Sequence, residues 1–108
     1  MFDVQVQHIG DTAVVAPEGE LDLATAHQLG AALAQAEHHG APRVILDLRR
    51  LTFVDSSGIG VIVKFKRHFA VEGVRFGVVK GDDNVQRAFA ISHVEALLPW
   101  TAPPIGAG

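Results

Sequence analysis

Hydrophobic and polar residues alternate over the first part of the chain. In residues 2–9, FDVQVQHI, apolar side chains fall mainly on one side and polar ones on the other, which predicts a half-buried strand. Gly10 and Asp11 then predict a tight hairpin turn, because glycine tolerates positive φ. The segment TAVVAP returns as a second strand, which is expected to end at Pro17.

The pattern then changes from a period of two residues to the helical period. A loop at residues 18–22 leads into a helix that Asp22 or Thr25 can cap and that Gly40 ends. The apolar residues that recur at helical spacing, and are expected to form its buried face, are Leu23, Ala26, Leu29, Leu33 and Ala36.

Two short apolar strands alternate with two further helices. RVILDL, at residues 43–48, is nearly all apolar, which is typical of a strand buried on both faces. VRFGVV, at residues 74–79, is the next strand. Helices are predicted over residues 57–73 and 82–98, and the second of these has three candidate caps, Asp82, Asp83 and Asn84.

The predicted order, β-β-α-β-α-β-α, indicates an α/β fold with a mixed sheet. Its two strand–helix–strand crossovers require parallel strand pairs and right-handed connections. The loops at residues 18–22, 49–58 and 80–84 should then open at one edge of the sheet, where sites form at the carboxyl ends of strands.

Composition narrows the class of protein. A chain of 108 residues with 48% hydrophobic residues suits one domain, expected over residues 1–100, followed by a flexible Pro- and Gly-rich tail over residues 101–108. The apolar runs are too short to span a bilayer, so we expect no membrane partner and a cytoplasmic location. A net charge of −3 argues against nucleic acid as a direct partner.

The chain has no cysteine, which excludes disulfides, thiolate chemistry and cysteine-based zinc sites. The neighbouring His38 and His39 suggest a metal, but no carboxylate or further histidine is spaced along the sequence to complete a site with them. We therefore expect neither a metal nor a cofactor.

The loop with the most chemistry reads FVDSSGIGVIV, residues 53–63. Asp55, Ser56 and Ser57 are all strong helix caps, so one interpretation is purely structural. A serine nucleophile is a second, but the G-x-S-x-G elbow is absent and nothing in the spacing favours a base such as His27 or His93. A phosphate-binding loop is a third, and the lysine that it requires is missing.

A phosphorylatable serine is the fourth interpretation. A helix N-terminus tolerates a phosphate, which adds roughly −1.5 to −2 charges at neutral pH. Asp55 lies beside the serines in sequence, and Asp22 is expected to face them from the neighbouring loop. A phosphate would make this acidic edge strongly negative and repel a docked partner while the fold survives.

The chain resembles the anti-sigma factor antagonists of the STAS family. The resemblance is carried by GELDLATA at residues 19–26, VILDLRRLTFVDSSGIGVIV at residues 44–63, GVRFGVV and VQRAFAISHVEALL, and it extends from residue 2 to about Trp100. It implies the STAS fold, a mixed four- to five-stranded sheet with about four helices packed on it. Family members often have Thr-Gly or Ser-Gly where Ser92 and His93 stand, so His93 would have to adopt a turn conformation more natural to glycine.

The resemblance also implies a function that is not enzymatic. In such proteins the unphosphorylated antagonist binds an anti-sigma factor that is also a serine kinase, and a sigma factor is released. The kinase phosphorylates the serine directly after the aspartate, which is Ser56 here, and a PP2C-type phosphatase reverses this; ATP belongs to the kinase. Asp22, Asp55, Ser56, Ser57 and Gly58 are the expected partner-binding residues. The alternative is a STAS interaction subunit of a transporter or another assembly, without a sigma-factor role.

Overall fold

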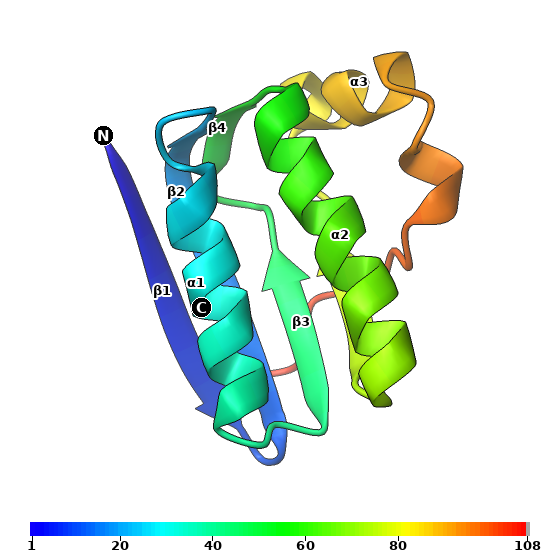
Figure 1. Cartoon of the computed structure of the whole chain (residues 1–108). Coiled ribbons are helices and arrows are strands. Elements are labelled where there is room, and N and C mark those ends of the chain that lie inside the picture. Colours follow the sequence, from blue (N-terminus) through cyan, green and yellow to red (C-terminus); the bar gives the residue numbers. More distant parts are fainter. Residues whose placement is uncertain (108) are drawn as a thin grey trace.

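The structure is a computed structural model that describes residues 1–107. Five strands and three α-helices follow one another along the chain (Figure 1). Their bounds are β1 Phe2–Ile9, β2 Thr12–Leu21, α1 Ala26–His38, β3 Arg43–Asp47, β4 Leu51–Val54, α2 Ser56–Glu72, β5 Arg75–Val79 and α3 Asp83–Ile91, followed by a 3-10 turn at Glu95–Leu97. Within the described residues there are thus three α-helices, where about four helices were expected.

The sheet is mixed, as the predicted crossovers require. β1 pairs with β2 in antiparallel register from Phe2–Gly19 to Ile9–Thr12. On its other side β2 pairs in parallel with two strands in succession, first with β3 and then with β4, and β3 pairs in parallel with β5. β2 therefore lies at the centre of the fold and carries the chain toward the edge where β4 ends.

Two features of the sheet correct the sequence prediction. β2 does not end at Pro17 but continues to Leu21. The proline lies between the residues that pair with β3, which end at Val15, and those that pair with β4, which begin at Gly19. A residue without an N–H is tolerated there because the strand is changing partners on that side. The second feature is β4 itself, which lies inside the stretch 49–58 that was expected to be a loop.

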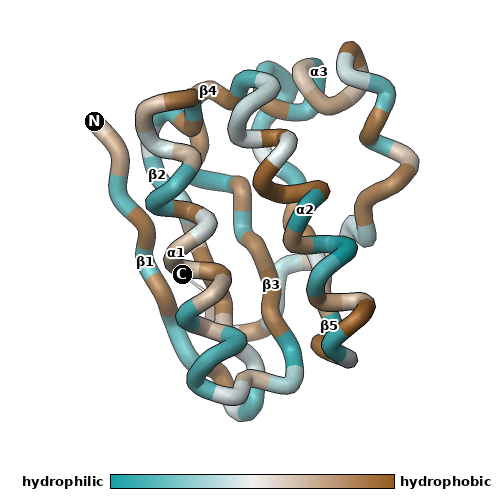
Figure 2. Tube along the Cα trace, viewed as in Figure 1, coloured by the Kyte–Doolittle hydropathy of each residue, from teal (hydrophilic) through white to brown (hydrophobic). Residues whose placement is uncertain are grey.

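The main core lies between the sheet and the helices. α1 and α2 run side by side across one face of the sheet (Figure 1). Alternate residues of the central strands, such as Ala13, Val15 and Leu46, point into this core and are fully buried. The apolar colour of β3 contrasts with the mixed colour of the helices in Figure 2. Burial of both faces of residues 44–47 confirms the prediction made for RVILDL.

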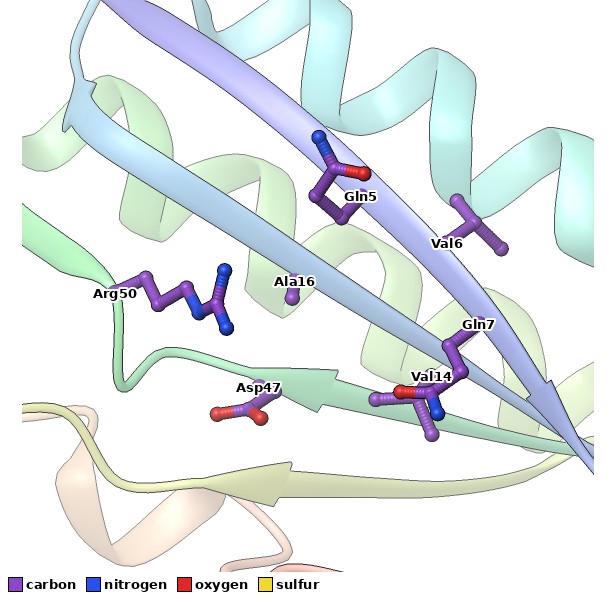
Figure 3. Close-up of a pocket in the computed structure, with 7 residues that line it drawn as sticks. All are labelled: Gln5, Val6, Gln7, Val14, Ala16, Asp47 and Arg50. Atoms are coloured by element: carbon purple, nitrogen blue, oxygen red, sulfur yellow. The ribbon is translucent and has the colours of Figure 1, made fainter. Parts of the chain in front are cut away.

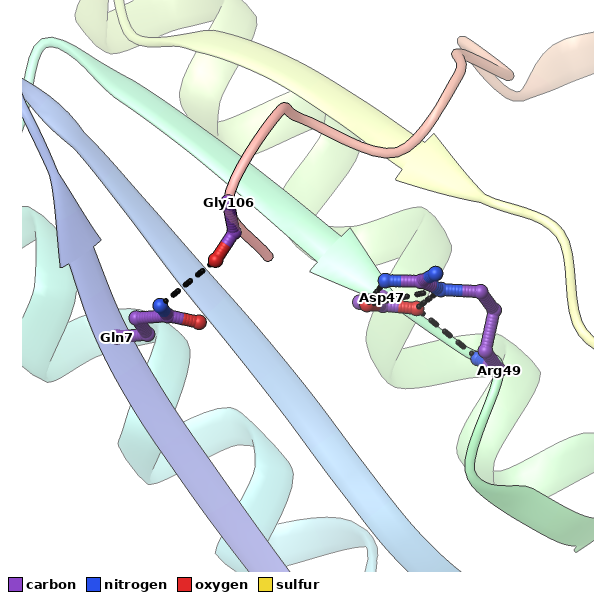
Figure 4. A network of polar contacts seen from close by, with 4 residues as sticks. All are labelled: Gln7, Asp47, Arg49 and Gly106. Atoms are coloured by element: carbon purple, nitrogen blue, oxygen red, sulfur yellow. Dashed lines mark hydrogen bonds and ion pairs between the residues drawn. The ribbon is translucent and has the colours of Figure 1, made fainter. Parts of the chain in front are cut away.

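The opposite face of the sheet carries a second, smaller apolar cluster of Val14, Ile45 and Val79. The C-terminal segment crosses this face (Figure 4), where the Gln7 side-chain amide donates a hydrogen bond to the Gly106 carbonyl at 3.1 Å. Nearer its start, the Thr101 N–H donates to the Val78 carbonyl at 2.9 Å. The segment 101–107 is therefore laid on the sheet; its flexibility stays a prediction.

A buried aspartate closes the end of β3. Asp47 is 3% exposed and accepts hydrogen bonds from the Arg49 guanidinium, with Nη2 at 2.7 Å from Oδ2 (Figure 4). This hydrogen bond and the attraction between the charges raise the pKa of the Arg49 guanidinium, while burial acts in the opposite direction. The arginine therefore stays protonated and compensates the buried carboxylate.

The third predicted helix is interrupted. α3 begins after Asp82, whose side chain accepts from the Val85 N–H at 2.9 Å, and it ends at Ile91. His93 then adopts φ 60°, the left-handed conformation that the sequence comparison with the family suggested. The predicted span 82–98 is thus a helix and a separate 3-10 turn.

Candidate functional site

Two neighbouring strand ends form the candidate site. Leu21 of β2 and Val54 of β4 are register partners, so Asp22 and Asp55 each follow a paired residue at the same edge of the sheet. The Asp55 N–H donates to the Leu21 carbonyl at 3.1 Å and joins the two chain segments directly. The structure therefore brings together the ends of the predicted loops 18–22 and 49–58 (Figure 1).

The third predicted loop, residues 80–84, does not follow a strand that pairs with β4. β5 ends at Val79, which pairs with Asp47 rather than with a residue of β4. From there α3 extends the chain to β4 and packs against it. Side chains of α3, such as Arg87 and Ile91, contribute to this edge together with Asn84, the last residue of the predicted loop.

Asp55 caps α2. Its carboxylate Oδ1 accepts from the Ser57 N–H at 2.9 Å and from the Gly58 N–H at 3.2 Å, in an extended N-cap conformation. Two of the unpaired amide groups of the first helical turn are satisfied in this way. The structure thus decides among the three cap candidates, and gives the capping role to Asp55 alone.

The Ser56 side chain does not cap α2. Ser56 is the first residue of α2, and it is exposed, whereas Ser57 is half-buried. Within residues 1–107 its hydroxyl makes no hydrogen bond, with a histidine or any other group. The arrangement of base and orienting acid that a serine nucleophile needs is therefore not formed around Ser56 in this part of the chain.

Gly58 is buried beneath the serines rather than presented to a partner. A Cβ atom built on it would lie 2.5 Å from Leu21 Cγ and 3.1 Å from Val54 Cγ2. The glycine lets the first turn of α2 approach the ends of β2 and β4, which sets the position of Ser56. A binding role for Gly58 stays a prediction, and its packing role is evident.

Asp22 shapes the loop before α1. Its Oδ1 accepts from the Ala24 N–H at 3.0 Å and the Thr25 N–H at 3.2 Å, while the Thr25 hydroxyl lies 2.8 Å from the Glu20 carbonyl. Thr25 occupies the N-cap position of α1, but neither it nor Asp22 makes a side-chain cap bond to the helix. The half-buried Asp22 is thus fixed in place next to the cap of α2.

Exposed apolar side chains surround this acidic edge, and the sequence prediction missed them. Leu23 was assigned to the buried face of the first helix, yet it is 80% exposed because it lies in the turn before α1. Phe53 and Ile91 are 42% and 68% exposed. They border a groove of about 180 Å³ lined by Phe53, Val54, Asn84, Arg87, Ala88 and Ile91. The sequence did contain a signal for the exposure of Leu23: it lies before Thr25, one of the two candidate caps, and so outside the helix if Thr25 is the cap.

A larger hollow lies elsewhere. It has a volume of about 260 Å³ and opens on the side of the sheet away from α1 and α2 (Figure 3). Its lining residues are Gln5, Val6, Gln7, Val14, Ala16, Asp47 and Arg50, none of which is a predicted site residue. The serine edge is therefore an exposed, acidic and partly apolar surface, which suits a protein partner better than an enclosed small molecule.

The fold and this edge define an α/β domain of the STAS class, a mixed sheet with a serine exposed at the start of its second helix. A profile of the STAS domain matches residues 3–106, and the chain belongs to this family. The predicted domain bounds, residues 1–100 with a tail at 101–108, stay a prediction.

The similar proteins are consistent with this membership. The chain is 26% identical over 99 residues to an anti-sigma F factor antagonist from Paenibacillus polymyxa, covering 91% of this chain and 85% of that one. An anti-sigma factor antagonist from Mycobacterium paratuberculosis has the same fold, with a TM-score of 0.84 at 22% identity over 97% of this chain and 88% of the other. The antagonist SpoIIAA in its unphosphorylated form has a TM-score of 0.77 at 25% identity, over 95% of this chain and 90% of SpoIIAA. A structure of SpoIIAA from Bacillus in its phosphorylated form has a TM-score of 0.71 at 24% identity, over 95% of this chain and 93% of SpoIIAA.

Over residues 1–107, no helix combines the length and the apolar character needed to cross a membrane.

Proposed function

We propose that this protein is an anti-sigma factor antagonist that is switched off by phosphorylation of Ser56. The observation that carries the proposal is that the capping residue and the exposed serine at the start of α2 are two different residues. Asp55 takes the cap, and the Ser56 hydroxyl is exposed and uncommitted. A kinase can therefore reach this hydroxyl, and modification does not remove a hydrogen bond from the fold.

The proposed partner is an anti-sigma factor that is also a serine kinase. It binds the unphosphorylated edge formed by Asp22, Asp55, Ser56 and Ser57, together with the exposed Leu23, and in doing so releases its sigma factor. The names of the similar proteins support this assignment, since they are anti-sigma factor antagonists. We place the protein in the cytoplasm, with no direct contact to nucleic acid and no catalytic activity of its own.

The physical basis of the switch is electrostatic. A phosphate on Ser56 adds roughly −1.5 to −2 charges next to the Asp55 carboxylate. The amides of Ser57 and Gly58 already bond to Asp55, so they do not neutralise the new charge. The phosphate projects from the surface, and a partner with acidic or apolar groups at this edge is repelled. SpoIIAA, which has been solved in a phosphorylated form, provides a precedent in the family.

In the transfer step, the Ser56 hydroxyl oxygen attacks the γ-phosphorus of the ATP that the kinase holds. The bond to the ADP oxygen breaks, and the serine proton passes to a base of the kinase. A PP2C-type phosphatase hydrolyses the phosphoserine and restores binding. No nucleotide site on this chain is required.

The test begins with the protein isolated from its own cells. Peptide mass analysis, with and without phosphatase treatment, should find phosphate on Ser56. Ser56→Asp should fold like the wild type but fail to capture the kinase in a pull-down, because it carries a fixed negative charge. Ser56→Ala should capture the kinase, remain unphosphorylated with ATP, and change the free energy of unfolding by less than about 0.5 kcal/mol.

Ser57→Ala tests which serine accepts the phosphate. Its change at the half-buried Ser57 should weaken kinase binding, because Ser57 belongs to the proposed binding edge, but the phosphate that is incorporated should still lie on Ser56. Phosphate incorporation in Ser56→Ala would move the acceptor to another residue. Absence of phosphate under every growth condition, with unimpaired binding by Ser56→Asp, would instead favour a constitutive STAS subunit of a transporter or another assembly.

A further inference from the structure

The tertiary structure brings one histidine and two glutamates together far from the serine edge. Glu37 lies near the end of α1, and His68 and Glu72 lie one turn apart near the end of α2. One ligand atom from each of these three side chains lies within 4.8 Å of the other two, and this is the one such group within residues 1–107. His68 Nε2 and Glu37 Oε1 are 2.6 Å apart.

The spacing along α2 explains the convergence. Residues four apart lie on the same face of a helix, so His68 and Glu72 project from one side of α2. α1 packs beside α2, and Glu37 reaches this side from the neighbouring helix. His68 and Glu72 are exposed and Glu37 is half-buried, so an ion can reach all three from solvent.

Aromatic neighbours restrict the His68 ring. The ring makes an edge contact with Phe65, with the centroids 6.0 Å apart and the planes at 78°. It also contacts Phe69, which is fully buried, at 5.9 Å. These contacts hold the imidazole against the end of α2, with Nε2 directed at Glu37, and reduce the entropy that a ligand set would lose on binding.

We propose that Glu37, His68 and Glu72 form a binding site for a divalent transition-metal ion of the Zn²⁺ class, which bridges α1 and α2. One imidazole nitrogen and two carboxylate oxygens are ligands that such ions accept, whereas Mg²⁺ and Ca²⁺ prefer oxygen alone. The three side chains leave further coordination positions to water. Two carboxylates also balance the charge of the ion.

The adjustment needed is small. Two ligands at Zn²⁺ distances of 2.0–2.1 Å in a tetrahedral arrangement are roughly 3.3 Å apart. His68 Nε2 and Glu37 Oε1, at 2.6 Å, must therefore separate by less than about 1 Å. Side-chain rotation can supply this shift, because neither side chain is fully enclosed: they are 43% and 25% exposed. The metal then replaces the direct His68–Glu37 hydrogen bond.

This site is independent of the proposed switch. At 1.5 Å per residue along α2, Ser56 and His68 are separated by roughly 18 Å. The bound ion would fasten the far ends of α1 and α2 and stabilise the folded state in proportion to its occupancy. The alternative is an ordinary surface His–Glu pair, and only the metal proposal requires Glu72.

The experiment uses the full chain without an affinity tag. Isothermal titration with ZnCl₂ should give one ion per chain, and Zn²⁺ should raise the thermal midpoint of unfolding. His68→Ala and Glu72→Gln should each weaken binding at least tenfold and abolish the thermal shift. Circular dichroism without metal should show both variants folded, since both residues are exposed. Titration with MgCl₂ should show much weaker binding.

The matched control is the double variant His38→Ala, His39→Ala, which removes two exposed histidines next to Glu37 and should bind Zn²⁺ like the wild type. Binding that is lost in this control, or kept in His68→Ala, would overturn the proposal. Adventitious surface sites bind metal with dissociation constants on the order of 1 mM. If no binding is detected at a metal concentration of about 1 mM, the proposal is overturned as well. None of these results depends on phosphorylation of Ser56.

Discussion

At the scale of single residues, His93 adopts a left-handed backbone conformation that is intrinsically unfavourable for a histidine. Its φ of 60° is costly for a residue with a Cβ, by roughly 1 kcal/mol or more. The surrounding bonds compensate, since the His93 N–H donates to the Ala90 carbonyl at 3.1 Å and the Val94 N–H to the Phe89 carbonyl at 3.3 Å. These bonds satisfy carbonyl groups at the end of α3 and turn the chain toward the 3-10 turn.

His93→Gly should therefore stabilise the protein. Glycine adopts this conformation without the steric cost, although its unfolded chain is more flexible, and the net gain should be about 0.5–1 kcal/mol. Urea unfolding followed by circular dichroism measures it. Ser92→Gly is the control: Ser92 has φ −79°, so glycine brings only flexibility there and should destabilise by about 0.5 kcal/mol. A loss of stability in His93→Gly would show that the histidine side chain itself supports this turn.

At the scale of elements, the start of α2 depends on close packing as well as on its cap. Gly58 and Gly60 look alike in the sequence, since both weaken the intrinsic helix propensity of the same turn. In the structure they differ. Gly58 is buried against Leu21, whereas a Cβ on Gly60 would meet no atom within 4 Å.

Gly58→Ala should destabilise the protein by about 1–3 kcal/mol, because the new methyl group overlaps Leu21 and Val54 and must displace the first turn of α2. Gly60→Ala, at an exposed helical position, should stabilise it by about 0.5–1 kcal/mol. Both values can be measured by urea unfolding, with the fluorescence of the single tryptophan as a second probe. Equal effects of the two changes would mean that the packing of Gly58 does not determine where α2 begins.

At the scale of the whole molecule, the C-terminal segment completes the second face of the sheet. Its start is anchored in the main core, where Trp100 packs edge-on against Phe89 with the centroids 5.4 Å apart and donates a hydrogen bond to the Glu95 carbonyl at 2.7 Å. Beyond it, Ala102 and Pro103 lie near Val79, and the Gly106 carbonyl accepts from Gln7 on β1. A segment with the composition of a loose tail is thus connected to both edges of the sheet.

Removal of residues 102–108 should therefore uncover part of the apolar cluster of Val14, Ile45 and Val79. We expect the free energy of unfolding to fall by about 2 kcal/mol and the binding of a hydrophobic dye to rise. Ile105→Ser is the control, because Ile105 is 97% exposed and its change should be nearly neutral. A truncated protein as stable as the full chain would support the flexible tail that the composition predicts.

Much of the fold could be predicted because local patterns were strong. The alternation in β1, the helical spacing in α1 and α2, and the apolar run of β3 each indicated the element that the structure contains. β4 was missed because four residues between charged and polar neighbours carry too little periodicity, and its pairing with β2 is a long-range contact. Leu23 was misplaced for a similar reason, since spacing alone does not show where the first helix begins.

The sequence by itself determined the order of elements, the acidic serine loop and the family, because these depend on neighbouring residues and on a local motif. Only the tertiary structure decided that Asp55 and not Ser56 is the cap, that Gly58 is buried, and that Asp22 lies beside Asp55. It also decided that Glu37 meets His68 and Glu72. The physical reason is the same in each case: hydrogen-bond geometry, burial and convergence of side chains follow from how distant segments pack.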